Sequence, residues 1–245
     1  MKLFLGVFAG IVLIALATIA TVSLSRSAPA SQPVHETRPL ASFHRVEIAG
    51  QATVTLVQGA AESVTVDAPG SIRVRTEVHG GTLEVEVEDR RRNWWFGRGP
   101  GKSAKVTVNL RDLDRIESAG AVTVIAEKLK SNDLFVDLTG ACTLKVADLQ
   151  ATKLKLDGSG ATKINLTGKV GRQDIDLSGA GSYEAAGLAS DEVSVTVSGA
   201  GKAVVNAKST LSVEISGAGK VEYLGDPKLT QSISGIGKVA RRQAS

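Results

Sequence analysis

The stretches VSVTVSGAGKAVVNA (residues 193–207) and LSVEISGAGKVEYLG (residues 211–225) repeat one pattern at a distance of 18 residues. Related short glycine motifs recur through the second half of the chain, and the second glycine of each motif recurs at steps of 18 to 21 residues. A period in this range is typical of solenoid proteins, in which each repeat contacts its neighbours. The reference glycines are Gly120, Gly140, Gly160, Gly181, Gly201, Gly219 and Gly237.

Apolar side chains recur at a fixed distance from these glycines. The residue four positions before the glycine is apolar in all seven repeats, and polar and apolar residues alternate around it. Alternation with a period of two is typical of strands with one buried face. The predicted fold is therefore all-β: a right-handed parallel β-helix with rungs of about 18–21 residues. The apolar column consists of Ile116, Val136, Leu156, Leu177, Val197, Ile215 and Ile233.

Each reference glycine is interpreted as a corner of the coil. A corner must reverse the chain within two or three residues, and the positive φ values that this requires are free of steric cost only for glycine. Glycine-rich loops also bind phosphate, but that use needs a following helix, whereas strands follow here. The seven glycines are therefore predicted to be structural.

The first 30 residues have a different character. Residues 3–24 are uncharged and mainly apolar, and as a helix they would span about 33 Å, one bilayer core. Residues 1–30 are predicted to be a hydrophobic helix, either a signal peptide cleaved near Ala30 or an uncleaved anchor in the inner membrane. Both alternatives place the remainder in the periplasm or at the cell surface. Residues 25–42 contain three prolines, and 31–42 is predicted to be a flexible linker.

The rest of the chain is predicted to be a single β-helical domain over residues 43–240. Residues 114–240 hold the regular glycine rungs, whereas 43–113 keep the strand alternation without the clean corner motif. The stretch IAGQATVTL (residues 48–56) nevertheless echoes SAGAVTVIA (residues 118–126). We interpret 43–113 as less regular amino-terminal rungs of the same body, interrupted by a protruding hairpin.

These features together resemble a known family. A chain that begins its domain with FHRVEIAGQATVTLVQG, continues through GGTLEVEVED and ends in serial SGAG rungs is similar to the putative auto-transporter adhesin head GIN domain family. The resemblance implies a bacterial envelope or surface protein with a right-handed β-helical body, an adhesive or structural role and no catalytic motif that could be carried onto residues here.

Composition limits the other functional classes. The net charge of +4 is too small to indicate nucleic acid binding. Cys142 is the only cysteine, so no disulfide can form within the chain. The three histidines, His35, His44 and His79, lack the spacing of a metal site and are interpreted as ordinary surface or strand residues. We expect neither a metal nor a cofactor.

One stretch combines aromatic and basic residues. DRRRNWWFGRGPGK (residues 89–102) holds both tryptophans of the protein between basic side chains, a composition that suits sugar stacking, a membrane interface or a protein partner. The alternative is that the rings fold back and cover an edge of the coil. The candidate binding residues are Arg90, Arg91, Arg92, Trp94, Trp95, Phe96 and Arg98.

A basic ladder follows the last corners. Lys202, Lys220 and Lys238 each come directly after a reference glycine and are predicted to stack on successive rungs. Such a row fits an acidic polysaccharide or lipid head group. The alternative is an edge guard, because lysines discourage another chain from pairing with an open strand edge.

An acidic column precedes the earlier corners. Glu117, Asp137 and Asp157 lie three residues before their reference glycines and are followed in the same column by serines. Stacked carboxylates could bind Ca²⁺ or act in glycoside hydrolysis. Capping of the turn by side-chain oxygens explains the column better, because it also accounts for its serine members.

The sequence therefore favours a non-enzymatic, exported envelope protein that acts as an adhesion or interaction module. Its partner is unknown, with an envelope polysaccharide or another surface protein as candidates, and residues 3–24 would add a membrane contact if uncleaved. Two alternatives stay open: a carbohydrate-active β-helix enzyme of the polysaccharide lyase or hydrolase type, and a structural unit that assembles end to end.

Overall fold

A computed structural model describes residues 33–89 and 103–243. Within these ranges every regular element is a strand, so no described helix is long and apolar enough to cross a membrane. The hydrophobic helix predicted within residues 1–30 and the aromatic stretch predicted to bind at 90–98 lie outside the described residues.

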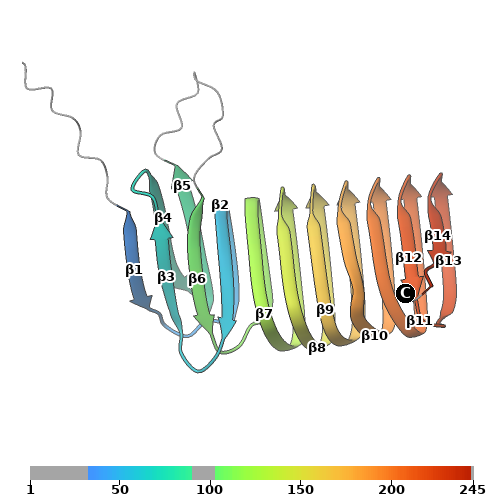
Figure 1. Cartoon of the computed structure of the whole chain (residues 1–245), viewed down its shortest axis with the longest axis horizontal. Helices are drawn as coiled ribbons and strands as arrows, with labels where there is room; N and C mark the ends of the chain where they lie inside the picture. The colour runs from blue at the N-terminus through green and yellow to red at the C-terminus, as the bar shows by residue number, and fades with distance from the viewer. Residues whose placement is uncertain (1–32, 90–102, 244–245) are drawn as a thin grey trace, which may run out of the picture. The chain divides into compact units, whose positions relative to one another are not determined.

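The strands follow one another along the coil, and the longest of them pass through a corner from one side to the other (Figure 1). Their bounds are β1 (Val34–Pro39), β2 (Arg45–Gln58), β3 (Ser63–Ala68), β4 (Ile72–His79), β5 (Thr82–Asp89), β6 (Ala104–Leu110), β7 (Arg115–Gly140), β8 (Thr143–Gly160), β9 (Lys163–Gly179), β10 (Ser182–Gly199), β11 (Lys202–Gly217), β12 (Lys220–Leu224), β13 (Lys228–Gly235) and β14 (Lys238–Arg241).

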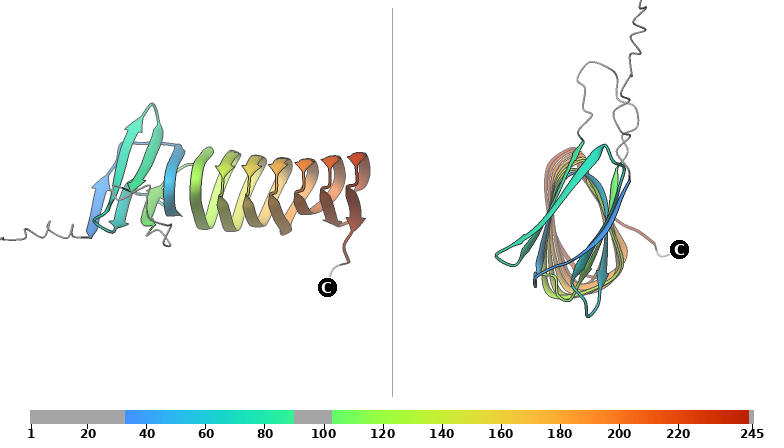
Figure 2. Two further views of the ribbon diagram at one scale, coloured as in Figure 1. Left: turned by 90° about the horizontal axis from the view of Figure 1, so that it is seen from above. Right: turned by 90° about the vertical axis from the view of Figure 1, so that its left-hand side faces the viewer.

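Successive rungs pair as parallel strands. β7 pairs with β8, β8 with β9, β9 with β10 and β10 with β11, all in parallel, and the coil makes about six turns. Seen along its axis, the rungs superpose into one flattened loop (Figure 2, right). The predicted all-β parallel β-helix is confirmed, whereas its right-handed sense stays a prediction from the handedness of parallel crossovers.

Two sides of the loop are distinguished by the corner glycines. We call the segments that lead into a corner the leading face and the segments that follow it the trailing face. The leading face consists of residues 45–49, 115–119, 133–139, 153–159, 172–178, 192–198, 210–216 and 228–234.

The corner glycines are shifted from the predicted ones in the later rungs. Gly160 pairs with Gly179, not with Gly181, and the positive φ values of 98° to 123° fall on the column that this register defines. The prediction of positive φ is therefore right for Gly120, Gly140 and Gly160 and wrong for the other four. The column consists of Gly50, Gly120, Gly140, Gly160, Gly179, Gly199, Gly217 and Gly235, and the four glycines wrongly assigned to it are Gly181, Gly201, Gly219 and Gly237.

Close stacking explains why both sets are glycine. At Gly179 a Cβ atom would lie 2.8 Å from the carbonyl oxygen of Gly160, so the corner backbones touch directly. The second glycine of each later motif lies two residues after the corner glycine, and its φ is not positive, so glycine is needed there for a different reason. A Cβ atom at Gly219 would lie 2.7 Å from Cγ1 of Val197, so glycine is needed to leave room for the apolar interior.

The apolar column changes register in the same way. Val136 pairs with Leu156, and Leu156 pairs with Ile175, whereas Leu177 pairs with Gly158. Leu177, Val197, Ile215 and Ile233 thus form a second column two positions along. The shift is by two residues, which preserves the inward direction of a strand side chain, and Leu177 is fully buried.

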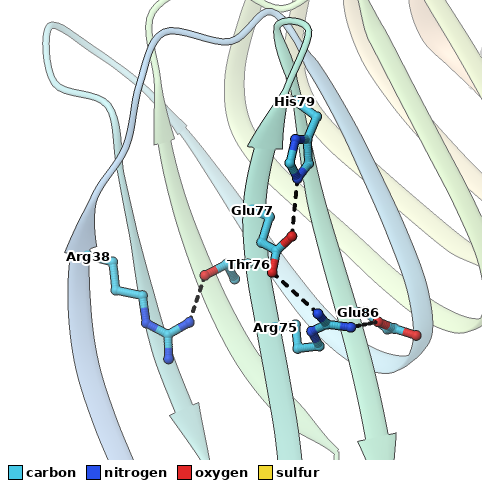
Figure 3. A network of polar contacts seen from close by, with 6 residues as sticks. All are labelled: Arg38, Arg75, Thr76, Glu77, His79 and Glu86. Carbon is cyan, nitrogen blue, oxygen red and sulfur yellow. Dashed lines mark hydrogen bonds and ion pairs between the residues drawn. The ribbon is translucent and has the colours of Figure 1, made fainter.

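The amino-terminal end of the coil is covered. β1 and β3 continue the trailing face as antiparallel strands, and β4 and β5 form a hairpin that continues the leading face. Both lie over this end of the loop (Figure 2). Figure 3 shows how they are joined: Arg38 of β1 donates a 2.7 Å hydrogen bond to Thr76 of β4, beside ion pairs of Arg75 and His79 with Glu77.

Part of the segment predicted to be a flexible linker at 31–42 forms a strand. Residues 34–39 form β1, which pairs along its whole length with Ser63–Ala68 of β3. β1 ends at Pro39, a residue that lacks an amide donor and is tolerated on an edge strand. Pro39 therefore marks the end of an edge strand.

The carboxyl-terminal rung is open by contrast. β13 and β14 pair on one side only, with β11 and β12, and nearly all of β13 is exposed. Ile233 is 40% exposed, although the equivalent residue one rung earlier, Ile215, is buried. Ile236 is 87% exposed at the corner, where the equivalent residue Ala218 is exposed as well. In the described part of the chain, no segment covers these two side chains.

Candidate functional site

A cleft of about 790 Å³ lies where the irregular first rungs meet the regular coil. β2 positions it, because the first half of β2 pairs with β5 on one side and with β7 on the other. Two bends complete the wall, residues 111–114 between β6 and β7 and residues 130–133 within β7. The charged and aromatic side chains of this junction cleft are His44, Arg45, Glu47, Asp112, Asp114, Arg115, Glu117, Lys130, Asp133 and Phe135.

Arg115 and Phe135 form the centre of the cleft. Both are outward residues of adjacent rungs, and the guanidinium carbon of Arg115 lies 5.4 Å from the centroid of the Phe135 ring. Arg115 also forms a 2.9 Å ion pair with Glu117 on its own strand. The ring is half-buried, so one apolar surface stays accessible among charged groups. This combination suits a ligand with apolar ring faces and polar hydroxyl groups.

The bend at Asp114 is fixed by its backbone. The amide of Asp114 donates to the carbonyl of His44 at 2.9 Å, and the amide of Phe135 donates to the carbonyl of Asp114 at 2.8 Å. The side chain of Asp114 lies 3.8 Å from Nε2 of His44. Two loops and a strand are therefore held together around the cleft. The predicted role of His44 as an ordinary surface residue is incomplete, because it lines the cleft.

Two carboxylates of the cleft, Asp114 and Glu117, are poorly suited to acid catalysis. The side chains of Asp114 and Glu117 are 51% and 41% exposed, and each faces a basic group. A general acid that must keep its proton at neutral pH needs an apolar surrounding instead. Exposed, paired carboxylates and guanidinium groups can still accept and donate hydrogen bonds to hydroxyl groups of a ligand. Within the described residues, no group of three His, Cys, Asp or Glu side chains could hold a metal ion.

A second hollow of about 480 Å³ lies farther along the leading face. It crosses β9, β10, β11 and β13, and Arg172 and Glu192 form a 3.4 Å ion pair at its border. Its outer wall is hydroxyl-rich, because Ser194, Ser212 and Thr230 stack on three successive rungs.

Comparison with protein families identifies the domain. The family model described as "Putative auto-transporter adhesin, head GIN domain" matches residues 42–227, which is most of the chain. The chain belongs to this family. The resemblance inferred from the sequence is thereby confirmed for the GIN domain, and no curated protein matches it.

Crystal structures of similar fold come from Bacteroides and Parabacteroides species. A putative adhesin from Bacteroides fragilis has a TM-score of 0.77 at 19% identity and covers 87% of this chain and 99% of its own. A putative lipid binding protein from Parabacteroides distasonis has a TM-score of 0.64 at 20% identity, with 86% and 97% covered. A putative adhesin from Parabacteroides merdae has a TM-score of 0.63 at 19% identity, with the same coverage. At these identities the likeness shows the fold alone.

The acidic column of this GIN domain differs from the predicted one. Its carboxylates occupy five successive rungs, and the predicted serines Ser178, Ser198, Ser216 and Ser234 belong to the neighbouring column. The assumption that these acids and serines share one column is therefore wrong, and capping of the turns stays a prediction. Two members are neutralised on their own strands, Glu117 by Arg115 at 2.9 Å and Asp157 by Lys155 at 3.7 Å. The column consists of Glu47, Glu117, Asp137, Asp157 and Asp176.

The basic ladder has the predicted geometry. Lys202 pairs with Lys220, and Lys220 pairs with Lys238, on the trailing face. Glu222, which the prediction left out, lies 2.6 Å from Lys220 and 3.5 Å from Lys202. The hydrogen bond from Lys220 lowers the pKa of the Glu222 carboxyl. Two of the three lysines therefore share one carboxylate, which weakens the ladder as a site for a polyanion.

The junction cleft was not predicted from the sequence. Its walls come from segments about 70 residues apart that meet only because β2 lies beside β7. One signal was present: the echo between residues 48–56 and 118–126 matches the observed pairing of Gly50 with Gly120. If the alignment of these two stretches is extended toward the amino terminus, it places Arg45 beside Arg115 and Glu47 beside Glu117.

Proposed function

We propose that this GIN domain is an exported, non-enzymatic module of the bacterial envelope that binds a surface polymer through the junction cleft. The observation that carries this proposal is the placement of Arg115 over the half-buried ring of Phe135 in a polar cleft of about 790 Å³. Membership of a family described as adhesin heads supports the same class of function.

The enzymatic alternative is favoured by one observation, the number of carboxylates around the cleft. It predicts that a bound polysaccharide is cleaved. Exposure and pairing of Asp114 and Glu117 argue for binding without cleavage, because neither carboxylate has the apolar surrounding of a catalytic acid.

The test is affinity electrophoresis of the protein through gels that contain polysaccharides, with reducing ends measured in parallel. We expect retardation of the wild type, loss of at least about tenfold in affinity for Arg115→Ala/Phe135→Ala, and no release of reducing ends. The matched control is Arg73→Ala, which removes an outward arginine of β4 away from the cleft. Equal retardation of the cleft variant and the wild type would exclude the cleft as the contact site, and release of reducing ends would favour an enzyme.

The aromatic stretch stays a second proposed contact. Trp94 and Trp95 lie outside the described residues, so a Trp94→Ala/Trp95→Ala variant belongs in the same gels. A loss that adds to that of the cleft variant would indicate that both regions touch the polymer.

End-to-end assembly is a further candidate function because Ile233, which continues the buried column of Ile215 on the last described rung, is 40% exposed. Sedimentation velocity over a range of concentrations tests it. Assembly predicts that Ile233→Ser abolishes a concentration-dependent increase in sedimentation coefficient.

A further inference from the structure

The junction cleft and the second hollow lie on the same face and share the same side-chain columns. Phe135 of the cleft pairs with Lys155, which pairs with Asp174, which pairs with Ser194 of the second hollow. The column continues through Ser212 to Thr230. The two hollows are therefore the two ends of one continuous row of outward side chains that runs along the coil axis.

This row has a length and a period that a polymer can match. It crosses the eight segments of the leading face, and parallel strands are about 4.8 Å apart, so it is on the order of 34 Å long. The spacing of the rungs is close to the advance of one pyranose unit along an extended chain. A linear polysaccharide laid along the axis would meet a similar set of side chains at each sugar.

The outward charges of the leading face as a whole, which includes the columns on either side of this row, favour a neutral polymer. Acidic and basic side chains alternate and pair, as in Arg115 with Glu117, Lys155 with Asp157 and Arg172 with Glu192. Carboxylates also outnumber basic groups, which disfavours a polyanion. The basic members are Arg45, Arg115, Lys153, Lys155, Arg172 and Lys228, and the acidic members are Glu47, Glu117, Asp133, Asp137, Asp157, Asp174, Asp176, Glu192 and Glu214.

Beyond the charged rungs the row becomes hydroxyl-rich. Outward positions of the last three rungs are mostly serine and threonine, including Ser194, Thr210, Ser212 and Thr230. Hydroxyl groups donate and accept hydrogen bonds with sugar hydroxyls without a charge to desolvate. Among the described residues, the outward side chains of the leading face are thus polar apart from small residues and the half-buried ring of Phe135.

We propose that the leading face is an axial track for one neutral, linear polysaccharide chain, anchored at Phe135 and continued over the second hollow. This proposal rests on the binding function proposed above and names its ligand class and direction. Because successive sugars bind to one rigid surface, contacts at the far end add to those at the cleft as effective concentration.

The experiment uses gels with dextran, mannan, xylan, alginate and polygalacturonate, followed by calorimetry with neutral oligosaccharides of increasing length from the retained polymer. We expect retention by at least one neutral polymer and by neither acidic one. Affinity should rise with length by about a hundredfold and level off near seven sugar units. Retention by the acidic polymers alone would overturn the proposal, as would binding to none of the five.

Variants separate the track from the cleft. Ser194→Gln/Ser212→Gln fills the second hollow without changing charge, and it should weaken binding of long oligosaccharides about tenfold while leaving short ones unchanged. Ser182→Gln makes the same change on an exposed position of the trailing face and should bind as the wild type. If the hollow variant binds long chains normally while Arg115→Ala/Phe135→Ala does not, the track is overturned and the cleft retained. If neither variant changes binding, both the cleft and the track are excluded as contact sites.

Discussion

The hydroxyl of Tyr183 donates a 2.6 Å hydrogen bond to Oε1 of Gln173 inside the coil, where both side chains are fully buried. Gln173 in turn donates to Ser190 Oγ at 2.5 Å and to the carbonyl of Leu188 at 3.5 Å. A polar chain thus crosses an otherwise aliphatic interior. Buried polar groups are stabilising only when they are fully paired, so this chain depends on each of its members.

Removal of the tyrosine hydroxyl should therefore destabilise the domain. Tyr183→Phe keeps the ring but leaves Oε1 of Gln173 without its donor, and we expect the free energy of unfolding to fall by about 1–3 kcal/mol. Urea denaturation followed by circular dichroism measures the change. An unchanged denaturation midpoint would contradict the assigned hydrogen bond.

Thr162→Val is the matched control, because it also removes one buried hydroxyl. Oγ1 of Thr162 is the one buried side-chain oxygen or nitrogen among the described residues that has no hydrogen-bond partner. Valine has nearly the same shape and no group to desolvate, so we expect this variant to equal or exceed the wild type by up to about 1 kcal/mol.

Tyr183 should also make the domain sensitive to alkali. Burial raises the pKa of Tyr183 far above its ordinary value of 10 in the folded state. Below pH 10 the tyrosine is protonated in both states, and its contribution to stability is constant. Above pH 10 it ionises in the unfolded chain only, so the folded state binds more protons and stability falls by about 1.4 kcal/mol per pH unit.

The difference between wild type and Tyr183→Phe isolates this effect from other groups that titrate in alkali. Their unfolding free energies should differ by a constant amount from pH 7 to 9.5 and converge above pH 10. Parallel curves up to pH 11.5 would show that the hydroxyl is not buried in the folded protein.

The corner glycines should not tolerate a side chain. At Gly179, φ is 106° and a Cβ atom would lie 2.8 Å from the carbonyl oxygen of Gly160. Backbone strain and overlap add there, so Gly179→Ala should lower the unfolding free energy by roughly 2–4 kcal/mol. Gly59→Ala is the control, because no atom lies within 4 Å of its Cβ position and φ is not positive; it should change stability by less than about 1 kcal/mol. Thermal melts of the two variants compare them, and equal melting temperatures would refute the assigned corner column.

The glycine register shows how far the sequence alone could go. The alternation of polar and apolar residues correctly assigned Leu156 and Leu177 to the interior. It could not show that the two residues belong to different columns, because a shift of the register by two residues leaves every side chain on the same face of the strand. The corner was misplaced because GSGA around Gly160 and SGAG around Gly179 each contain two glycines. The corner glycine is the second glycine in the first motif and the first glycine in the other. Only the pairing of Gly160 with Gly179 shows which glycine of each motif turns the chain.

The junction cleft could not be predicted from the sequence for a different physical reason. A repeat predicts what recurs, whereas the cleft exists where the repeat begins and the pattern changes. Arg115 and Phe135 differ from the residues in their column on later rungs, and nothing in their local sequence indicates that the 111–114 bend folds beside them. Positions that break a regular pattern are often functional.

The basic ladder offers a last test, based on its charge. Glu222 contacts both Lys202 and Lys220 on the trailing face, so one of the three positive charges of the wild-type ladder is neutralised. Glu222→Gln should strengthen binding to heparin about fivefold at low salt, and the gain should vanish as salt screens the lysines. Glu214→Gln makes the same change in net charge on the leading face and should leave heparin binding close to that of the wild type. Elution from a heparin column in a salt gradient measures both variants. If Glu222→Gln and Glu214→Gln elute at the same salt concentration, heparin binding depends on net charge alone and the lysines form no local site.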